Sequence, residues 1–293
     1  MKEKWKNYLS KFKSKKIRNI EYSYPVKDLD TDSNVLKQDP AKINRENKLI
    51  SNFLDRKWRV AIDFGCGIGS KFNLFDKKNY KNNLLIGIEP DFSRFTRAVK
   101  RAGKLRWITT KILNAGIEFL EKSPSNLLID LIICIQVLGH VTQKQFENII
   151  DVFNKVISPV GSFVIAVPII GSGFKDNIDA KEWDGTSDFT HLVNFDKVPG
   201  EKGYRHYVGL DKFNEISKKP VPNRLPVRSF LLPDFPDPNK IEIPYKFDKL
   251  PSTIEKALKN DIVPEEIYLY SIHKDSKHSN FPIGDLIIYL HKI

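Results

Sequence analysis

Cysteine is scarce in this chain of 293 residues, which has only two, Cys66 and Cys134. They do not form a pair or cluster with the spacing of metal ligands. The sequence therefore argues against a disulfide framework, and we expect no bound metal. Secreted proteins of oxidising compartments are usually richer in cysteine, so we expect a reducing compartment, the cytoplasm.

Long apolar runs are also missing. The longest, residues 127–141, is interrupted by Asp130, Gln136 and His140, whereas a membrane-spanning helix needs about 20 predominantly apolar residues in succession. The N-terminus is basic but lacks the apolar core of a secretory signal. We therefore predict neither a transmembrane segment nor secretion.

Positive charge is plentiful and unevenly distributed. The net charge of +12 comes from 48 Lys and Arg against 36 Asp and Glu, and residues 1–60 contribute +8 of it. Residues 1–18 hold eight basic residues and one acid. A basic arm can contact RNA, DNA or an anionic membrane, although lysine is abundant throughout and a solvated helix explains the charge equally well. We predict an N-terminal arm and linker at 1–43, with RNA as a candidate partner of residues 1–18.

The same arm has the pattern of an amphipathic helix. Trp5, Leu9, Phe12 and Ile17 fall on one side of a helix over residues 1–20. Such an apolar stripe usually packs on the parent domain. We therefore expect this helix to dock on the remainder of the chain.

Apolar strands alternate with amphipathic helices from residue 44 onward. The expected strands are 58–63, 84–89, 105–110, 127–135 and 162–167. Such alternation indicates parallel βαβ units in a doubly wound sheet. Residues 266–273 and 285–291 then alternate apolar and polar side chains, which predicts a closing antiparallel hairpin. The predicted fold is α/β, with seven strands, five of them parallel, and helices on both faces.

A glycine-rich turn follows the first of these strands. Residues 60–69, VAIDFGCGIG, predict a buried strand and then a turn that opens a helix. Gly65, Gly67 and Gly69 let the backbone turn sharply and let a ligand approach main-chain N–H groups. Asp63 supplies a carboxylate at the strand end, the edge where doubly wound sheets bind ligands.

Four motifs, taken in order, resemble those of the class I S-adenosylmethionine (SAM)-dependent methyltransferases, with similarity to methyltransferase types 11 and 12. Residues 63–69, DFGCGIG, are similar to the D-x-G-x-G-x-G motif that faces the methionine end of the cofactor. Glu89 takes the place of the acid that bonds both ribose hydroxyls, because a carboxylate can accept two hydrogen bonds from a diol. Residues 130–141 resemble the fourth motif, and 157–165 resemble the turn that follows it.

The resemblance implies a Rossmann-like fold, SAM as cofactor and a methyltransferase domain over 44–293. It also implies an insertion for acceptor recognition at about 170–262. The cofactor-binding residues it implies are Asp63, Gly65, Cys66, Gly67, Gly69, Glu89, Pro90, Asn114, Ala115 and Gln136. The third motif departs from the family, which places an aspartate against the adenine amino group. Here Asn114 could accept that hydrogen bond, and Glu118 is the alternative.

Methyl transfer needs little covalent help, since the sulfonium already activates the methyl group and the enzyme mainly aligns the reactants and excludes water. A hydroxyl acceptor would benefit from a general base, for which His140, His191 and His206 are candidates. A ring-nitrogen acceptor would need none, and His140 is also explained as a packed or capping residue. RNA is favoured as acceptor by the basic arm, and a small molecule by a proline-rich segment at 219–251 that could close as a lid.

Two other functions stay open. A catalytically silent SAM-fold protein that binds nucleic acid or activates a partner is compatible with the lack of any decisive catalytic residue. A nicotinamide-dependent dehydrogenase would have the spacing G-x-G-x-x-G. The spacing of this chain, G-x-G-x-G, favours SAM.

Overall fold

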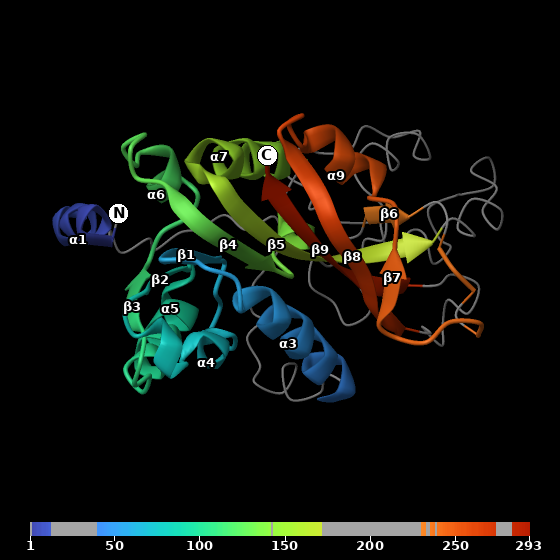
Figure 1. Ribbon diagram of the computed structural model, residues 1–293, viewed down its shortest axis with the longest axis horizontal. Coiled ribbons are helices and arrows are strands. Elements are labelled where there is room, and N and C mark those ends of the chain that lie inside the picture. The colour runs from blue at the N-terminus through green and yellow to red at the C-terminus, as the bar shows by residue number, and fades with distance from the viewer. Residues whose placement is uncertain are drawn as a thin grey trace, which may run out of the picture.

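The computed structural model describes residues 2–12, 40–141, 143–171, 230–232, 235–237, 239–273 and 283–293. In these residues a single twisted sheet forms the centre of the molecule, and helices lie against it (Figure 1). None of the described helices is long and apolar enough to cross a membrane.

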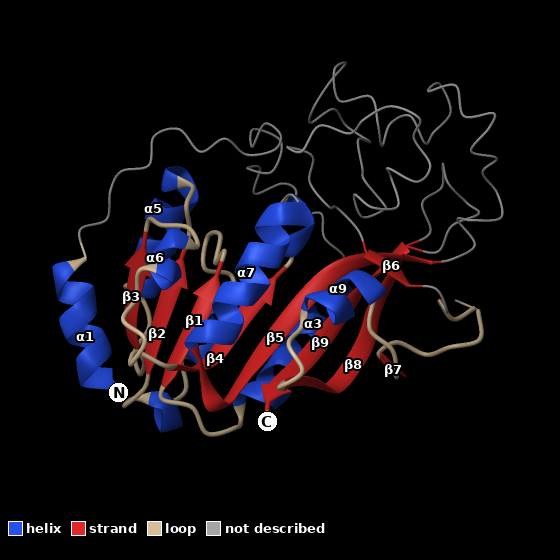
Figure 2. Ribbon diagram, turned by 90° about the horizontal axis from the view of Figure 1, so that it is seen from above, coloured by secondary structure: helices blue, strands red, loops and turns tan. Residues whose placement is uncertain are grey.

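Nine strands of the described residues form this sheet. They are β1 (Val60–Phe64), β2 (Leu84–Ile88), β3 (Thr109–Leu113), β4 (Ile129–Ile135), β5 (Ile157–Gly171), β6 (Phe230–Leu232), β7 (Tyr245–Phe247), β8 (Ile262–His273) and β9 (Ile283–Lys292). Their order is β3-β2-β1-β4-β5-β9-β8-β7, and β6 pairs with the end of β5 (Figure 2). Strands β1 to β5 are parallel, whereas β9 runs antiparallel to both β5 and β8. The predicted parallel core and closing hairpin are confirmed.

Helices cover both faces of the sheet. They are α1 (Lys2–Lys11), α3 (Pro40–Leu54), α4 (Phe72–Phe75), α5 (Phe92–Ala102), α6 (Glu118–Glu121), α7 (Gln143–Val156) and α9 (Ser252–Ala257), with the short 3-10 helices η2 (Lys78–Tyr80) and η3 (Leu138–His140). Along β1, Val60, Ile62 and Phe64 join one hydrophobic cluster with α1, α6, α7 and α9. Ala61 joins a second cluster with α3, α4 and α5. Burial on both faces explains why the central strands are almost wholly apolar.

The N-terminal helix docks as expected. Trp5 is fully buried, and its ring lies 6.2 Å from that of Phe119 on α6. Its Nε1–H donates to the Leu128 carbonyl at 2.9 Å. One side of the basic arm is therefore part of the core.

Several boundaries differ from the predictions. The third strand is at Thr109–Leu113, not 105–110, because Leu105 and Ile108 pack from the preceding loop. Helix α3 begins at Pro40, four residues before the expected start of the domain. Strand β5 begins at residue 157 and bulges at 158–161, where a turn was expected.

The expected count of seven strands was too low by two. Strands β6 and β7 have three residues each and lie within the proline-rich part of the predicted insertion. Three residues are too few to show an alternating pattern, which is why the sequence did not predict them. Residues 172–229, the greater part of that insertion, lie outside the described residues.

Candidate active site

The candidate site lies where the order of the sheet reverses. Strand β1 is flanked by β2 on one side and β4 on the other, with Asp63 opposite both Gly87 and Ile133. Doubly wound sheets bind ligands in the crevice at this switch point, at the carboxyl ends of the strands. The glycine turn predicted from the sequence begins there, directly after Phe64.

All three glycines of the turn have positive φ, at 67° for Gly65, 55° for Gly67 and 76° for Gly69. A Cβ at Gly65 would lie 2.4 Å from Cγ2 of Val137, and one at Gly69 would lie 2.4 Å from Cε2 of Phe72. A Cβ at Gly67 would have no heavy atom of the described ranges within 4 Å. The absence of a side chain at Gly65 and Gly69 therefore lets the turn pack closely against Val137 and Phe72. Gly67 instead faces open space in the described structure.

Asp63 is a buried acid with an unsatisfied oxygen. Its side chain is 3% exposed, and Oδ2 has no hydrogen-bond partner among the residues that the structure describes. Burial raises its pKa to about 7. The positive charge of Lys71 lowers this pKa, and the negative charge of Glu89 raises it further. A buried polar atom without a partner costs free energy, so this oxygen is suited to a ligand donor or cation.

Glu89, also 3% exposed, joins two loops at the strand edge. Its Oε2 accepts the Gly67 backbone N–H at 2.8 Å and its Oε1 accepts that of Asp91 at 2.9 Å. Asp91 in turn caps α5 by accepting the Arg94 N–H. Burial raises the pKa of Glu89 even though these N–H groups and Arg94 favour its charged form. The structure thus brings Glu89 directly to the glycine turn.

The residues of the third motif contact the segment that follows β2, at the same edge of the sheet. Asn114 is buried, and its Nδ2 donates to the carbonyls of Glu89 at 3.0 Å and Pro90 at 2.7 Å. Ala115 is buried in the core beside it. The Cys66 backbone N–H donates to Ile88, and burial raises the pKa of its thiol well above the ordinary value. Cys66 therefore contributes backbone geometry rather than a thiolate.

Gln136 is the only non-glycine residue with positive φ among the described residues, at 58°. Its Nε2 donates to Oη of Tyr270 at 3.0 Å and to Oδ1 of Asp285 at 2.7 Å. A left-handed backbone at a non-glycine residue costs about 1 kcal/mol or more. These two hydrogen bonds fix the side chain at the carboxyl end of β4, within the predicted site.

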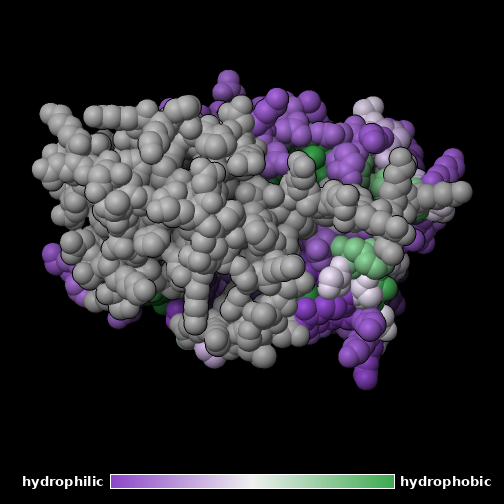
Figure 3. Space-filling view, turned by 180° about the vertical axis from the view of Figure 1, so that it is seen from behind, coloured by the Kyte–Doolittle hydropathy of each residue, from purple (hydrophilic) through white to green (hydrophobic). Residues whose placement is uncertain are grey.

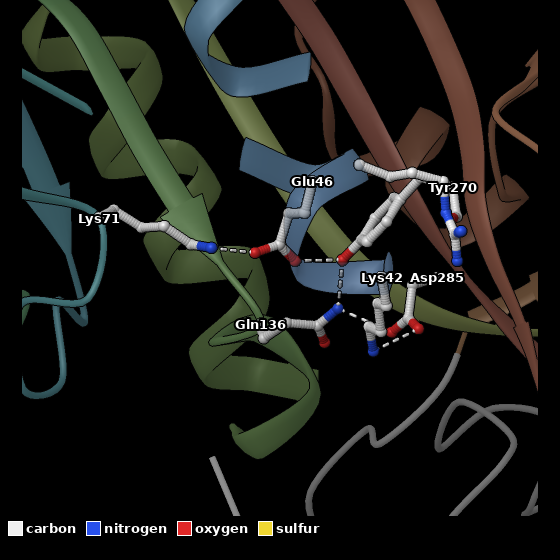
Figure 4. A network of polar contacts seen from close by, with 7 residues as sticks. Lys42, Glu46, Lys71, Gln136, Tyr270 and Asp285 are labelled. Atoms are coloured by element: carbon white, nitrogen blue, oxygen red, sulfur yellow. Dashed lines mark hydrogen bonds and ion pairs between the residues drawn. The ribbon is translucent and has the colours of Figure 1, made fainter. Parts of the chain in front are cut away.

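A network of buried polar side chains extends from Gln136 (Figure 4). The Tyr270 hydroxyl donates to Glu46, and Glu46 is paired with Lys71, which lies two residues after the glycine turn. Lys42 pairs with Oδ2 of Asp285 at 2.6 Å. Arg45 joins the network by donating to the Tyr270 backbone carbonyl at 2.8 Å. The network thus has three cations and two carboxylates, and it ties α3 to the ends of β4, β8 and β9.

The network was missed by the sequence analysis. Its members other than Gln136 are Lys42, Arg45, Glu46, Lys71, Tyr270 and Asp285. Lys42 and Glu46 are one helical turn apart, a spacing equally typical of a solvated helix face. An isolated Tyr and Asp in the terminal hairpin gave no indication either.

Removing the Tyr270 hydroxyl is expected to destabilise the fold by about 2 kcal/mol, because Glu46 and Gln136 each lose a buried partner. Urea unfolding of Tyr270→Phe against the parent measures this. Tyr289→Phe is the matched control, since the buried Tyr289 hydroxyl has no hydrogen-bond partner within the described part of the chain. Equal losses in both variants would contradict the network's contribution.

Of the three predicted general bases, the structure describes the backbone position of one. His140 ends η3, directly after β4, but nothing is described of its side chain. His191 and His206 lie outside the described residues. Within the described ranges, no group of three or more His, Cys, Asp or Glu side chains could hold a metal ion.

Comparison with known proteins bears on this site. A family model described as a methyltransferase domain matches residues 36–198, more than half of the chain. No curated protein matches it. The N-methyltransferase NodS from Bradyrhizobium japonicum WM9, solved with S-adenosyl-L-homocysteine (SAH), is similar in fold, with a TM-score of 0.52, 14% identity and coverage of 93% of this chain and 99% of that one.

A second similar structure is the magnesium protoporphyrin IX methyltransferase from Synechocystis PCC 6803 with bound SAH. It has a TM-score of 0.48 and 11% identity, over 86% of this chain and 84% of the other. At these identities the structural likeness concerns the fold, and the family model carries the assignment. The chain belongs to the methyltransferase domain family, and with it the predicted enzyme of the class I SAM-dependent type is confirmed.

Proposed function

We propose that this enzyme binds SAM over the glycine turn and transfers its methyl group to an acceptor that enters at the carboxyl ends of β4 and β5. The observation that carries the proposal concerns the described part of the chain: open space at Gly67 beside two buried acids, one of which has an oxygen without a partner there. A nucleoside with a cationic tail suits this arrangement, because it supplies hydroxyl donors and positive charge.

Each end of SAM has partners of suitable chemistry. Glu89 would exchange its backbone N–H contacts for the two ribose hydroxyls, and Asp63 would face the cationic methionine end. The amide nitrogen of Asn114 donates to two carbonyls, and its amide oxygen is an acceptor of the kind that the adenine amino group requires. Pro90 and Ala115 would flank the base, and Gln136 would line the reacting end.

SAM supplies an activated methyl group, so the chain's own residues mainly position the reactants. Buried Asp63 and Glu89 fix the cofactor, while the polar network holds α3 against the reacting edge. The candidate bases are His140, His191 and His206, and a hydroxyl acceptor would need one of them. A nitrogen acceptor would need only alignment and the exclusion of water.

Calorimetry with SAM and with NAD tests cofactor choice. We expect SAM to bind and NAD to give no heat of binding, and the reverse result would overturn the proposal. Mass spectrometry after incubation with SAM and fractionated RNA or metabolites identifies the acceptor. A chain that binds SAM and methylates no fraction would be the silent alternative.

We further propose that the enzyme works in the cytoplasm. Cys66 and Cys134 are both buried and unpaired. Burial raises the pKa of both thiols, which keeps them as unreactive thiols. Localisation of a tagged full-length chain tests this.

Gly67→Ala is expected to separate cofactor binding from folding. The added methyl group meets no heavy atom of the described residues, so the expected penalty comes from the left-handed backbone, about 1–2 kcal/mol. It would occupy the space proposed for SAM and weaken its binding by roughly 10-fold or more, as measured by calorimetry. Gly65→Ala is the contrasting variant, since its Cβ would overlap Val137. We expect it to lower the free energy of unfolding by about 3 kcal/mol. Unchanged SAM affinity in Gly67→Ala would contradict the proposed site.

A further inference from the structure

The strongest concentration of positive charge among the described residues follows the cofactor strand β2. Residues 92–111 contain seven Lys and Arg and no Asp or Glu. Lysine abundance does not explain this segment, because four of the chain's eleven arginines are at 94, 97, 101 and 106. Arginine presents a planar fork of donors that matches phosphate oxygens.

These residues share one end of the molecule. Helix α5 packs against β3, the edge strand of the sheet, and the loop between them carries Lys104 and Arg106. Lys100, Lys104, Arg106 and Lys111 are exposed. We name the surface of residues 92–111 the α5–β3 surface. It lies at the end of the molecule that carries α1 and β3 in Figure 1.

Little negative charge opposes this surface. Within the described residues, no ion pair joins a carboxylate to Lys100, Arg101 or Lys104. The nearby acids are occupied, since Asp91 caps α5 and Asp76 accepts the backbone N–H groups of Arg106 and Trp107. Asp76 and Glu89 attract Arg106 and Arg94, so it is the positive charge of Lys100, Arg101 and Lys104 that is available to a partner.

Exposed aromatic side chains are interleaved with the charges. Five large hydrophobic residues are exposed among the described residues, and three of them, Phe92, Val99 and Trp107, belong to the α5–β3 surface, with Phe92 43% and Trp107 42% exposed. The corresponding end of the molecule, on the right in Figure 3, is mainly hydrophilic with a small hydrophobic area. Aromatic rings amid cations are typical of surfaces on which unpaired bases stack.

The surface leads to the proposed cofactor site. Helix α5 starts at Asp91, whose backbone N–H is bonded to Glu89, and its eleven residues extend about 16 Å away from there. On the other side of β3, Lys2 of α1 donates to the Thr109 hydroxyl at 3.3 Å. A polyanion lying along α5 would therefore pass from the basic arm to the active site.

We infer that the α5–β3 surface binds RNA and guides it to the active site, with phosphates on the basic side chains and a base stacked on Trp107. A membrane is the less suitable partner, because the exposed apolar side chains are separated by charges and form no continuous stripe. The inference that the surface binds RNA is independent of the proposed function. The further step, that this RNA is the methyl acceptor, rests on the proposed function.

The test is fluorescence anisotropy of the full chain with labelled bulk tRNA over a series of salt concentrations. The parent should bind with an affinity that falls steeply with salt. The triple variant Lys100→Gln, Arg101→Gln, Lys104→Gln should lower the slope of log K against log salt by about 2 and weaken binding by roughly 10- to 100-fold. Trp107→Ala should lose about 10-fold with the slope unchanged.

The matched control removes three exposed lysines from α7 and α9, by Lys144→Gln, Lys155→Gln and Lys256→Gln. An equal loss in this control, or no loss in the α5–β3 variant, would overturn the inference. Binding to anionic lipid vesicles without binding to tRNA would assign the surface to a membrane and overturn it as well. SAM calorimetry on the same proteins tests the proposed function separately, since the α5–β3 variants should bind SAM like the parent. Loss of tRNA binding with normal SAM binding therefore concerns the surface alone, whereas a parent that does not bind SAM contradicts the proposed function.

Discussion

Glu89→Gln is expected to weaken SAM binding by on the order of 100-fold. The carboxylate of Glu89 is buried and already accepts two hydrogen bonds, from the backbone N–H groups of Gly67 and Asp91. Two ribose hydroxyls can replace those donors with similar geometry. Hydrogen bonds to a charged group each contribute about 1.5–3 kcal/mol, so the loss of charge and of one acceptor explains the expected size.

Glutamine is the informative replacement because it keeps the size of the side chain. Its NH₂ group would face a backbone N–H of Gly67 or Asp91, donor against donor, and could not serve both hydroxyls. Calorimetry with SAM measures the loss. Urea unfolding without SAM shows whether the fold itself has changed.

Glu118→Gln is the matched control. Glu118 also accepts a loop N–H, that of Gly116 at 2.9 Å, and it is the alternative to Asn114 as the adenine partner. We expect its SAM affinity to stay within a few-fold of the parent. A large loss in Glu118→Gln with little in Glu89→Gln would contradict the assignment of Glu89 and favour the alternative alignment of the third motif.

The candidate residues whose positions in the fold could be predicted from the sequence are those that depend on their immediate neighbours. Asp63 and Glu89 each end a continuous apolar strand, and parallel strands place their carboxyl ends at one edge. The glycines of the turn are recognisable because only glycine adopts positive φ readily. These features are local, so a sequence shows them.

The polar network depends on segments far apart in the chain. Glu46 and Tyr270 are separated by 224 positions and Gln136 and Asp285 by 149, so no spacing rule links them. The third strand was misplaced for a related reason, since Leu105 and Ile108 are apolar through tertiary packing of a loop. The described part of the site beyond the motifs is thus a product of the assembled fold.

Asp63→Asn is expected to make the protein without SAM more stable at alkaline pH. The pKa of Asp63 is about 7 in the folded chain, because burial disfavours its charge, and about 3.9 when unfolded. Between these values the folded state binds more protons than the unfolded state, so the stability contributed by this group falls as pH rises from about 4 through 7. The loss between pH 5 and pH 8 is on the order of 3 kcal/mol, and asparagine, which does not titrate, avoids it.

Urea unfolding of parent and Asp63→Asn at pH 5 and pH 8 measures the difference. Glu89, whose pKa burial also raises, and Lys71 are the charged groups beside Asp63, and both are present in parent and variant. Asp76→Asn is the control, and its expected effect on stability at pH 8 has the opposite sign. Burial alone would raise the pKa of Asp76, but the backbone N–H groups of Arg106, Trp107 and Ile108 hold it below its usual value, so that variant should lose stability at pH 8.

The two variants should also respond differently to SAM. A ligand that binds only the folded state stabilises it in proportion to its affinity, so SAM should stabilise the parent and Asp76→Asn but hardly Asp63→Asn. If Asp63→Asn were less stable than the parent at pH 8, the carboxylate would have an unrecognised structural partner. A gain in stability together with a loss of SAM binding would mean that Asp63 is kept as a buried acid for the cofactor, at a cost to the stability of the fold.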